Sequence, residues 1–305
     1  MAHSVLNSDP SRHSTDTETQ AIDRVRSLVW KIAIATVLLM AVGSATRVAN
    51  AGLACPDWPL CYGQLVPTAQ MNLQVFLEWF HRLDASLIGL LSIGLVGQTW
   101  WWRRELPTWL PWMSVFTLGL IVFQGVLGGL TVTELLRFDI VTAHLGTALL
   151  FFVTVLSIGL ALVPYNGTGA AKHLRWVGLV GAVLVYLQSL LGALVASQWV
   201  LHQCLSYQTL CAVMNSHIVG VVPPTLAVFT LVIWAGRTPT LSQPLKTLAH
   251  LSGLLVLLQI GLGVATFYLR LQVEPLTVSH QTVGALLLGS LVAFTAFAFR
   301  DEQFA

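Results

Sequence analysis

Charged residues are scarce in this 305-residue sequence: Asp, Glu, Lys and Arg together make up 9% of it, whereas hydrophobic residues make up 55%. A soluble globular protein carries about 25% charged residues, so this scarcity excludes an ordinary water-soluble domain. The net charge is only +2 and there is no basic stripe, which excludes a nucleic-acid-binding function. The composition therefore indicates that lipid surrounds most of the folded chain.

Long apolar runs are abundant, and eight of them reach the roughly 20 residues that a helix needs to cross a bilayer. They cover residues 28–49, 76–101, 109–131, 140–163, 174–197, 213–236, 246–268 and 276–299. The polar residues 1–27 are rich in Ser, Thr and Asp and are predicted to form a disordered tail. A secretory signal has a shorter apolar core close to a basic start, so the first run is interpreted as an uncleaved transmembrane helix.

The basic residues are distributed unevenly between the two sides of the predicted bundle. Eleven of the fifteen Lys and Arg residues lie on the side of the N-terminus, and only Arg47, Arg82, Arg137 and Arg270 lie at or near the other side. Basic connections remain cytoplasmic, so a cell-membrane protein with both termini in the cytoplasm is expected. The outward-facing connections are then 50–75, 132–139, 198–212 and 269–275.

Cysteine is also rare, and its few positions are informative. The four cysteines form two close pairs, Cys55 with Cys61 and Cys204 with Cys211, in the two longer outward connections. An oxidising exterior favours disulfides there, and pairing within each loop is the simplest connectivity. Zinc binding is a weaker interpretation, because neither pair has a second pair of ligands beside it.

Four of the nine histidines recur at a fixed spacing. His81 and His144 are 63 residues apart, as are His217 and His280, and 136 residues separate equivalent members of the two pairs. The surrounding segments also resemble each other: 140–150 resembles 276–287, and QGVLG (124–128) resembles QIGLG (259–263). The sequence therefore predicts an all-α integral membrane protein with two tandem four-helix bundles, 28–163 and 174–299, related by internal duplication.

These four histidines are expected to lie at one depth near the outer face. Each falls a few residues inside an even-numbered helix, and five residues correspond to a rise of about 7 Å. The second and fourth helices of an up-down bundle are diagonal neighbours, so two imidazoles can hold an object between them. A haem with two axial histidines fits this description, whereas a lone histidine in a membrane can simply hydrogen-bond a neighbouring helix.

The polar residues beside the histidines differ between the two halves. Glu78 lies one turn before His81 on the same helical face, and Arg82 follows it, whereas apolar residues take both places around His217. Arg47 adds a second cation at the outer end of the first helix. A carboxylate at the membrane boundary is costly and is therefore a functional candidate. The alternative is an i,i+4 pair of Glu78 with Arg82 that only satisfies itself.

Two motifs then make the sequence recognisable. The stretch TRVANAGLACPDWPLCYGQLVP (46–67), followed by EWFHR (78–82), resembles the haem A synthase family, and the resemblance extends over residues 28–299. Members of this family oxidise the C8 methyl group of haem O to a formyl group through a hydroxymethyl intermediate. The resemblance implies the same reaction here. Its expected partners are haem O, the haem O synthase that supplies it, membrane lipid and an electron acceptor that the sequence does not identify.

The resemblance also implies roles for individual residues. The first half would bind the haem O iron between His81 and His144, and the second half would hold a haem b between His217 and His280 for electron transfer. Glu78 would be the essential catalytic acid.

The resemblance also has implications for the cysteines in the two longer outward connections. Cys55 and Cys61 would form a disulfide over the substrate pocket, and Cys204 and Cys211 match the members that have a second pair. Members without that pair repeat a Cys-Pro-Asp-Trp-Pro-like element in the second loop, and this chain has LHQCLSYQTLC (201–211) instead. From charge alone, we expect Arg47 and Arg82 to contact haem propionates.

Two other functions would use some of the same residues. A two-haem b-type membrane electron carrier would need the four histidines, but it would bind two identical haems and would have no use for a carboxylate in one half only. A quinone-linked thiol oxidoreductase would use the outward cysteine pairs. Neither pair is a Cys-x-x-Cys, however, and the four histidines would remain unexplained.

Overall fold

The computed structural model describes residues 10–196, 211–269 and 273–304, and it contains no β-strand in this part of the chain. Eight helical segments there are long and apolar enough to span a membrane, which confirms the predicted all-α membrane class. The elements are α1 (Pro10–Val48), η1 (Thr68–Gln70), α2 (Leu73–Trp101), α3 (Leu110–Thr133), α4 (Phe138–Ala161), α5 (Leu174–Ala196), α7 (Cys211–Val219), α8 (Val222–Gly236), α9 (Gln243–Tyr268), α10 (Glu274–Asp301) and η2 (Glu302–Phe304).

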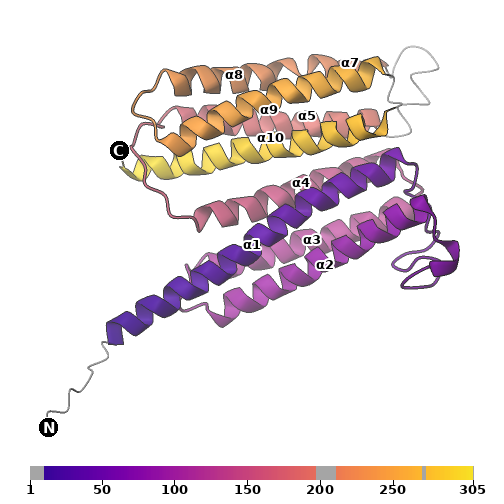
Figure 1. Cartoon of the computed structure of the whole chain (residues 1–305), viewed down its shortest axis with the longest axis horizontal. Coiled ribbons are helices and arrows are strands. Elements are labelled where there is room, and N and C mark those ends of the chain that lie inside the picture. The colour runs from indigo at the N-terminus through magenta and orange to yellow at the C-terminus, as the bar shows by residue number, and fades with distance from the viewer. Residues whose placement is uncertain (1–9, 197–210, 270–272, 305) are drawn as a thin grey trace, which may run out of the picture.

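The helices form two bundles that lie side by side (Figure 1). In the first, α1 and α3 each pack against both α2 and α4, so α2 and α4 occupy opposite corners. In the second, α5 and α9 each pack against both α8 and α10. The bundles meet where α10 packs against α1 and α4, and where α4 packs against α5. The helix pairings are therefore equivalent in the two halves, while their origin by duplication stays a prediction.

The first helix begins much earlier than the sequence predicted. A disordered tail was expected over residues 1–27, but α1 already begins at Pro10. Ala21 and Val25 are buried in one apolar cluster with Val29 and with residues near the C-terminal end of α2 and the N-terminal end of α3. Figure 1 shows the resulting extension of α1 beyond the ends of those helices. The prediction was wrong for residues 10–27, because a few apolar residues at helical spacing suffice to dock an otherwise polar segment.

The sixth span is interrupted, although a continuous helix was predicted over 213–236. The helix α7 ends at Val219 and α8 begins at Val222. Pro223 and Pro224 have no N–H group, so the carbonyl groups four residues earlier lose their helical donors. The break lies three residues after His217 and thus close to a candidate site residue.

The connection between the bundles is fixed by a buried carboxylate at the end of α10. Asp301 accepts hydrogen bonds from the Tyr165 hydroxyl at 2.9 Å and from the N–H groups of Thr168 and Ala171 at 2.8 and 3.0 Å. Burial raises the pKa of the Tyr165 phenol to about 12, so this hydroxyl remains a donor at neutral pH. The segment 162–173 is therefore held against the second bundle.

Candidate functional site

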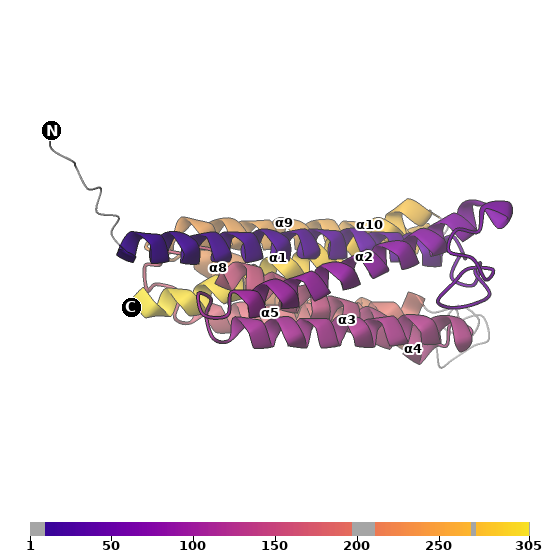
Figure 2. The same ribbon diagram turned by 90° about the horizontal axis from the view of Figure 1, so that it is seen from below.

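The four candidate histidines lie near the beginning of four helices. His81 is in α2, His144 in α4, His217 in α7 and His280 in α10. The beginnings of these helices lie at the same end of the molecule (Figures 1 and 2). Eight residues into α2 correspond to a rise of about 12 Å, and six residues into each of the others to about 9 Å. Both bundles thus place an imidazole on each of two opposite corners at a similar depth.

The pair in the second bundle faces directly across it. The ring centroids of His217 and His280 are 6.4 Å apart, and the ring planes are nearly perpendicular, at 85°. A metal ion between two imidazole nitrogens, about 2 Å from each, would set the ring centres roughly 6 Å apart. In the first bundle, His144 lies close enough to His81 to interact with it electrostatically. The geometry of the second pair therefore fits two axial ligands of one metal ion.

A glycine on a neighbouring helix faces each of these rings. A Cβ atom added to the glycine would lie 2.7–3.2 Å from the imidazole Cε1, which leaves no room for a side chain. The four contacts are Gly43 of α1 with His81, Gly128 of α3 with His144, Gly192 of α5 with His217, and Gly263 of α9 with His280. Each histidine is thus packed between two adjacent helices of its bundle. No site was predicted from these glycines, although Gly128 and Gly263 belong to the repeated QGVLG and QIGLG segments, where small residues allow a flat ring or a neighbouring backbone to approach closely.

Other metal chemistry finds no support in the described residues. They contain no group of three or more His, Cys, Asp or Glu side chains able to hold a metal ion. A zinc site built from the histidines would need such a group, whereas a haem needs only two axial ligands.

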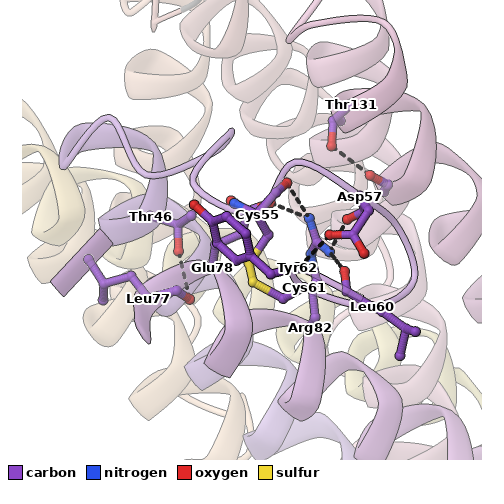
Figure 3. A network of polar contacts seen from close by, with 11 residues as sticks. Thr46, Cys55, Asp57, Leu60, Cys61, Tyr62, Leu77, Glu78, Arg82 and Thr131 are labelled. Carbon is purple, nitrogen blue, oxygen red and sulfur yellow. Dashed lines mark hydrogen bonds and ion pairs between the residues drawn. A yellow bond between two sulfur atoms is a disulfide. The ribbon is translucent and has the colours of Figure 1, made fainter. Parts of the chain in front are cut away.

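Glu78 is buried at the start of α2, and both of its carboxylate oxygens accept hydrogen bonds (Figure 3). The helix begins after Asn72, whose side chain accepts a hydrogen bond from the N–H group of Val75. One Glu78 oxygen accepts the N–H group of Cys55 at 2.8 Å, and the other pairs with the Arg82 guanidinium at 2.5 Å. The i,i+4 pair expected as an alternative therefore exists. It also fixes the loop above the helix.

The Arg82 guanidinium extends from α2 into that loop. It donates to the carbonyl groups of Asp57 and Leu60 at 2.6 and 2.5 Å and to that of Cys55 at 3.3 Å (Figure 3). Cys55 and Cys61 form the predicted disulfide, which closes this short loop. The loop, α2 and the buried carboxylate are consequently one connected unit beside His81.

Hydrogen bonds within the loop and a packing contact with α3 fix the remainder of the loop. The Asp57 carboxylate accepts the N–H groups of Tyr62 and Gly63 at 2.6 and 2.7 Å. The hydrogen bond from Gly63 is the largest cause that lowers the pKa of Asp57 below its usual value. The Trp58 ring packs against Gly129 of α3, where an added Cβ would lie 3.2 Å from the ring. The loop thus covers the ends of both α2 and α3.

The remaining predicted site residues are less closely connected. The side chain of Arg47, half-buried at the end of α1, makes no hydrogen bond or ion pair with any other described residue. The second cysteine pair falls outside the described side chains, because Cys204 lies in 197–210 and only the backbone of Cys211 is described. The structure therefore brings Glu78, His81, Arg82 and the first disulfide together, and His217 and His280 together.

Comparison with known proteins gives a consistent result over almost the whole chain. A family model described as cytochrome oxidase assembly protein matches residues 26–292. The haem A synthase of Caulobacter vibrioides is 30% identical over 92% of this chain and 98% of its own length. Those of Shewanella oneidensis and Shouchella clausii are each 27% identical, over 90% and 88% of this chain and 98% and 95% of their own lengths.

Proposed function

The chain belongs to the family of cytochrome oxidase assembly proteins and is an oxidoreductase that converts haem O to haem A, and we propose that its two bundles hold two different haems. The observation on which this division depends is the unequal setting of the two histidine pairs. A buried carboxylate and a disulfide-closed loop lie one turn from His81. Apolar residues take the equivalent places around His217.

The first bundle is proposed as the substrate site, with His81 and His144 as ligands of the haem O iron. Among the described residues, only this bundle places an acid beside a proposed ligand. Such an acid can stabilise charge that develops during a reaction at a methyl group. Arg47 is proposed to contact a propionate, since its guanidinium has no partner among the described residues and suits a carboxylate geometrically. Arg82 is a less suitable contact, because four of its hydrogen bonds go to Glu78 and the loop.

The second bundle is proposed to hold haem b between His217 and His280. The centroid separation of 6.4 Å supports this assignment, because it suits two imidazoles that share one iron. When bound there, haem b supplies one-electron transfer. The chain's own contribution is to hold both rings in place, each packed against a glycine of the neighbouring helix.

Glu78, the catalytic acid that the resemblance implies, is proposed to act as an ionised carboxylate that stays in place. Both of its oxygens accept hydrogen bonds, from Cys55 and from Arg82. A carboxylate held in this way is oriented one turn from His81. It can stabilise positive charge that develops at the methyl carbon of the substrate. This arrangement supports electrostatic stabilisation more than proton transfer, which would require Glu78 to leave its partners.

Chromatography of the extracted haems tests the role of Glu78. Glu78→Gln is expected to accumulate haem O, to form no haem A and to retain haem b when it is expressed with a source of haem O. Glu134→Gln is the matched control, because Glu134 is an exposed carboxylate in the α3–α4 connection. Normal haem A formation in Glu78→Gln would remove this residue from the mechanism.

Haem composition and one cysteine variant distinguish the proposed function from the two alternative functions. A two-haem b-type carrier would contain haem b only, even with haem O available. A thiol oxidoreductase would lose its activity in Cys55→Ser while keeping its haems, whereas a structural disulfide that is lost lowers stability by about 2–4 kcal/mol.

The orientation in the membrane is proposed from charge and redox chemistry together. The disulfide of Cys55 and Cys61 lies in the loop before α2, and this loop lies at the end of the molecule where α2 and α4 begin (Figure 2). Disulfides persist in oxidising compartments, and the opposite end carries most of the Lys and Arg residues. We therefore propose that both termini are cytoplasmic and that the haem ligands lie near the outer face.

A further inference from the structure

The residue one turn before each histidine-facing glycine is the same in three of the four cases. Gln124, Gln188 and Gln259 precede Gly128, Gly192 and Gly263 by four residues, whereas Leu39 precedes Gly43. In all four cases the main-chain carbonyl of this residue lies near the imidazole of the neighbouring helix. Three of the rings therefore have a carboxamide beside them, and His81 has an aliphatic side chain instead.

The three carboxamides contact their histidines directly. The Gln124 amide donates to the His144 carbonyl at 2.9 Å, and the Gln188 amide donates to the His217 carbonyl at 2.6 Å and lies 3.0 Å from His217 Nδ1. The Gln259 amide lies 3.4 Å from His280 Nε2. These bonds cross from one helix to the next, so they fix each histidine relative to its neighbour.

Both members of two of these pairs have a polar atom without a partner. His144 Nδ1 and Gln124 Oε1 are both buried without a hydrogen-bond partner among the described residues, and so are His280 Nδ1 and Gln259 Oε1. A histidine that ligates a metal donates its other ring N–H group to an oxygen acceptor, which fixes the tautomer and the ring orientation. A flip of the amide or of the ring exchanges donor and acceptor in place. Gln259 can offer this acceptor by such a flip, whereas Gln124 and Gln188 already donate to the carbonyl groups of their histidines and hold them by those bonds.

His81 lacks a carboxamide partner. Its Nδ1 is buried without a hydrogen-bond partner among the described residues, as are those of His144 and His280. Leu39 has no side-chain acceptor, so it offers the ring only its main-chain carbonyl. Among the described residues, His81 therefore has no interhelical side-chain contact of the kind that the glutamines make with the other three histidines.

We propose that Gln124, Gln188 and Gln259 are positioning residues for the haem ligands, and that His81, which has none, is the ligand released when haem O enters and haem A leaves. This inference rests on the proposed function, because it assigns His81 to the substrate site. It also explains why the two bundles differ at this position. A cofactor that stays bound gains from two oriented ligands, whereas a substrate that must exchange gains from one fixed ligand and one labile ligand.

Transfer of haem to excess apomyoglobin tests the labile ligand. The purified full-length protein loaded with haem O is mixed with apomyoglobin, and the haems that remain are separated by chromatography. We expect haem O and haem A to leave the wild type at least about tenfold faster than haem b. Leu39→Gln is expected to slow the loss of haem O by about tenfold, by the usual effect of such a partner. Leu39→Met, which has a similar size and no amide, is the matched control and should exchange at the wild-type rate.

Spectroscopy of the retained haem b tests the positioning residues. Gln188→Leu and Gln259→Leu are expected to release haem b about 10–100-fold faster and to change the low-temperature electron paramagnetic resonance spectrum of the oxidised haem. Gln98→Leu in α2, on the opposite side of the membrane span from the histidines, is the control and should leave both readouts unchanged. A purely structural loss of packing would lower the protein yield but would leave the spectrum of the remaining holoprotein unchanged.

The outcomes separate this inference from the function on which it rests. Equal rates of haem O and haem b loss, or equal effects of Leu39→Gln and Leu39→Met, would overturn the assignment of His81 as the labile ligand. Unchanged spectra in Gln188→Leu and Gln259→Leu would overturn the positioning role. A wild type that binds haem b in both bundles and never haem O would instead contradict the proposed function.

Discussion

At the scale of single residues, the close approach of glycine to imidazole is the most restrictive feature of the candidate sites. A Cβ atom on Gly263 would lie 2.9 Å from His280 Cε1, whereas a Cβ atom on Gly261, in the same helix, would meet nothing within 4 Å. Alanine is favoured over glycine in helix interiors by about 1 kcal/mol. A loss of haem on Gly263→Ala substitution would therefore arise from the contact between the added Cβ atom and the His280 ring, and not from a lower helix propensity.

Gly263→Ala is accordingly expected to displace the His280 ring and to lower the haem b content of the purified protein several-fold. Gly261→Ala, the matched control, should retain the wild-type content. The haem b content per mole of protein, measured by optical spectroscopy of the reduced pyridine complex, checks this. Equal retention in the two variants would mean that the His280 ring is free to move and is not fixed by its neighbours.

The Glu78–Arg82 pair gives a second prediction at this scale. Only 5% of the Glu78 side chain and 15% of the Arg82 side chain are exposed, so Arg82→Ala leaves a buried carboxylate without its cation. Such a change costs about 3–5 kcal/mol. We expect protease cleavage between residues 50 and 67 to become faster by orders of magnitude. Arg137→Ala, at an exposed pair, is the control and should cost less than about 1 kcal/mol. Similar cleavage of both variants would show that Arg82 does not fix the loop.

At the scale of elements, the conformation of the loop 50–72 should depend on pH through Asp57. Hydrogen bonds from Gly63 and Tyr62 lower the pKa of this carboxyl in the folded protein. A lowered folded pKa contributes stability above the unfolded pKa of about 3.9, and this stability is lost as the pH falls through the folded value. The loop is therefore expected to open as the pH is lowered below about 4.

Hydrogen exchange of the peptide that contains residues 55–66 checks this expectation, after correction for the intrinsic pH dependence of exchange. Protection should fall between pH 5 and pH 3 in the wild type by a larger factor than in Asp57→Asn, which cannot ionise at this position. The same pH dependence in both proteins would exclude Asp57 as its source.

Elements were predictable from the sequence to the extent that their signals are local. The eight apolar runs predicted the eight spans because a lipid environment requires about 20 apolar residues in each. The extension of α1 over 10–27 was missed, since Ala21 and Val25 gain their burial from α2, α3 and α4 rather than from their own segment. The break after Val219 was missed although its cause, Pro223 with Pro224, is visible in the sequence.

The candidate site was predictable only in part, for a related reason. Repetition singled out the four histidines, the unequal polar residues of the two halves singled out Glu78, and close spacing in a predicted outward connection singled out Cys55 with Cys61. Gly43, Gly192, Gln188 and the contrast with Leu39 depend on which helix lies beside which, and a sequence without its fold does not specify that. The signal nearest to them was the repeated Gln-x3-Gly in QGVLG and QIGLG.

At the scale of the whole molecule, two bundles with equivalent helix pairings enclose two histidine pairs in unequal surroundings. They are joined by the packing of α10 on α1 and α4 and by the Asp301 anchor on the 162–173 connection. This arrangement holds the two histidine pairs in one molecule, each within its own bundle. The proposed division assigns chemistry to the first bundle and electron transfer to the second, according to the residues beside each pair.

Haem composition of two ligand variants tests this division most directly. Full-length His144→Ala and His280→Ala are expressed with a source of haem O, and their extracted haems are separated by chromatography. We predict that His144→Ala contains haem b but neither haem O nor haem A, and that His280→Ala loses haem b while it still binds haem O. Loss of the same haem from both variants, or haem b alone in the wild type, would contradict the account.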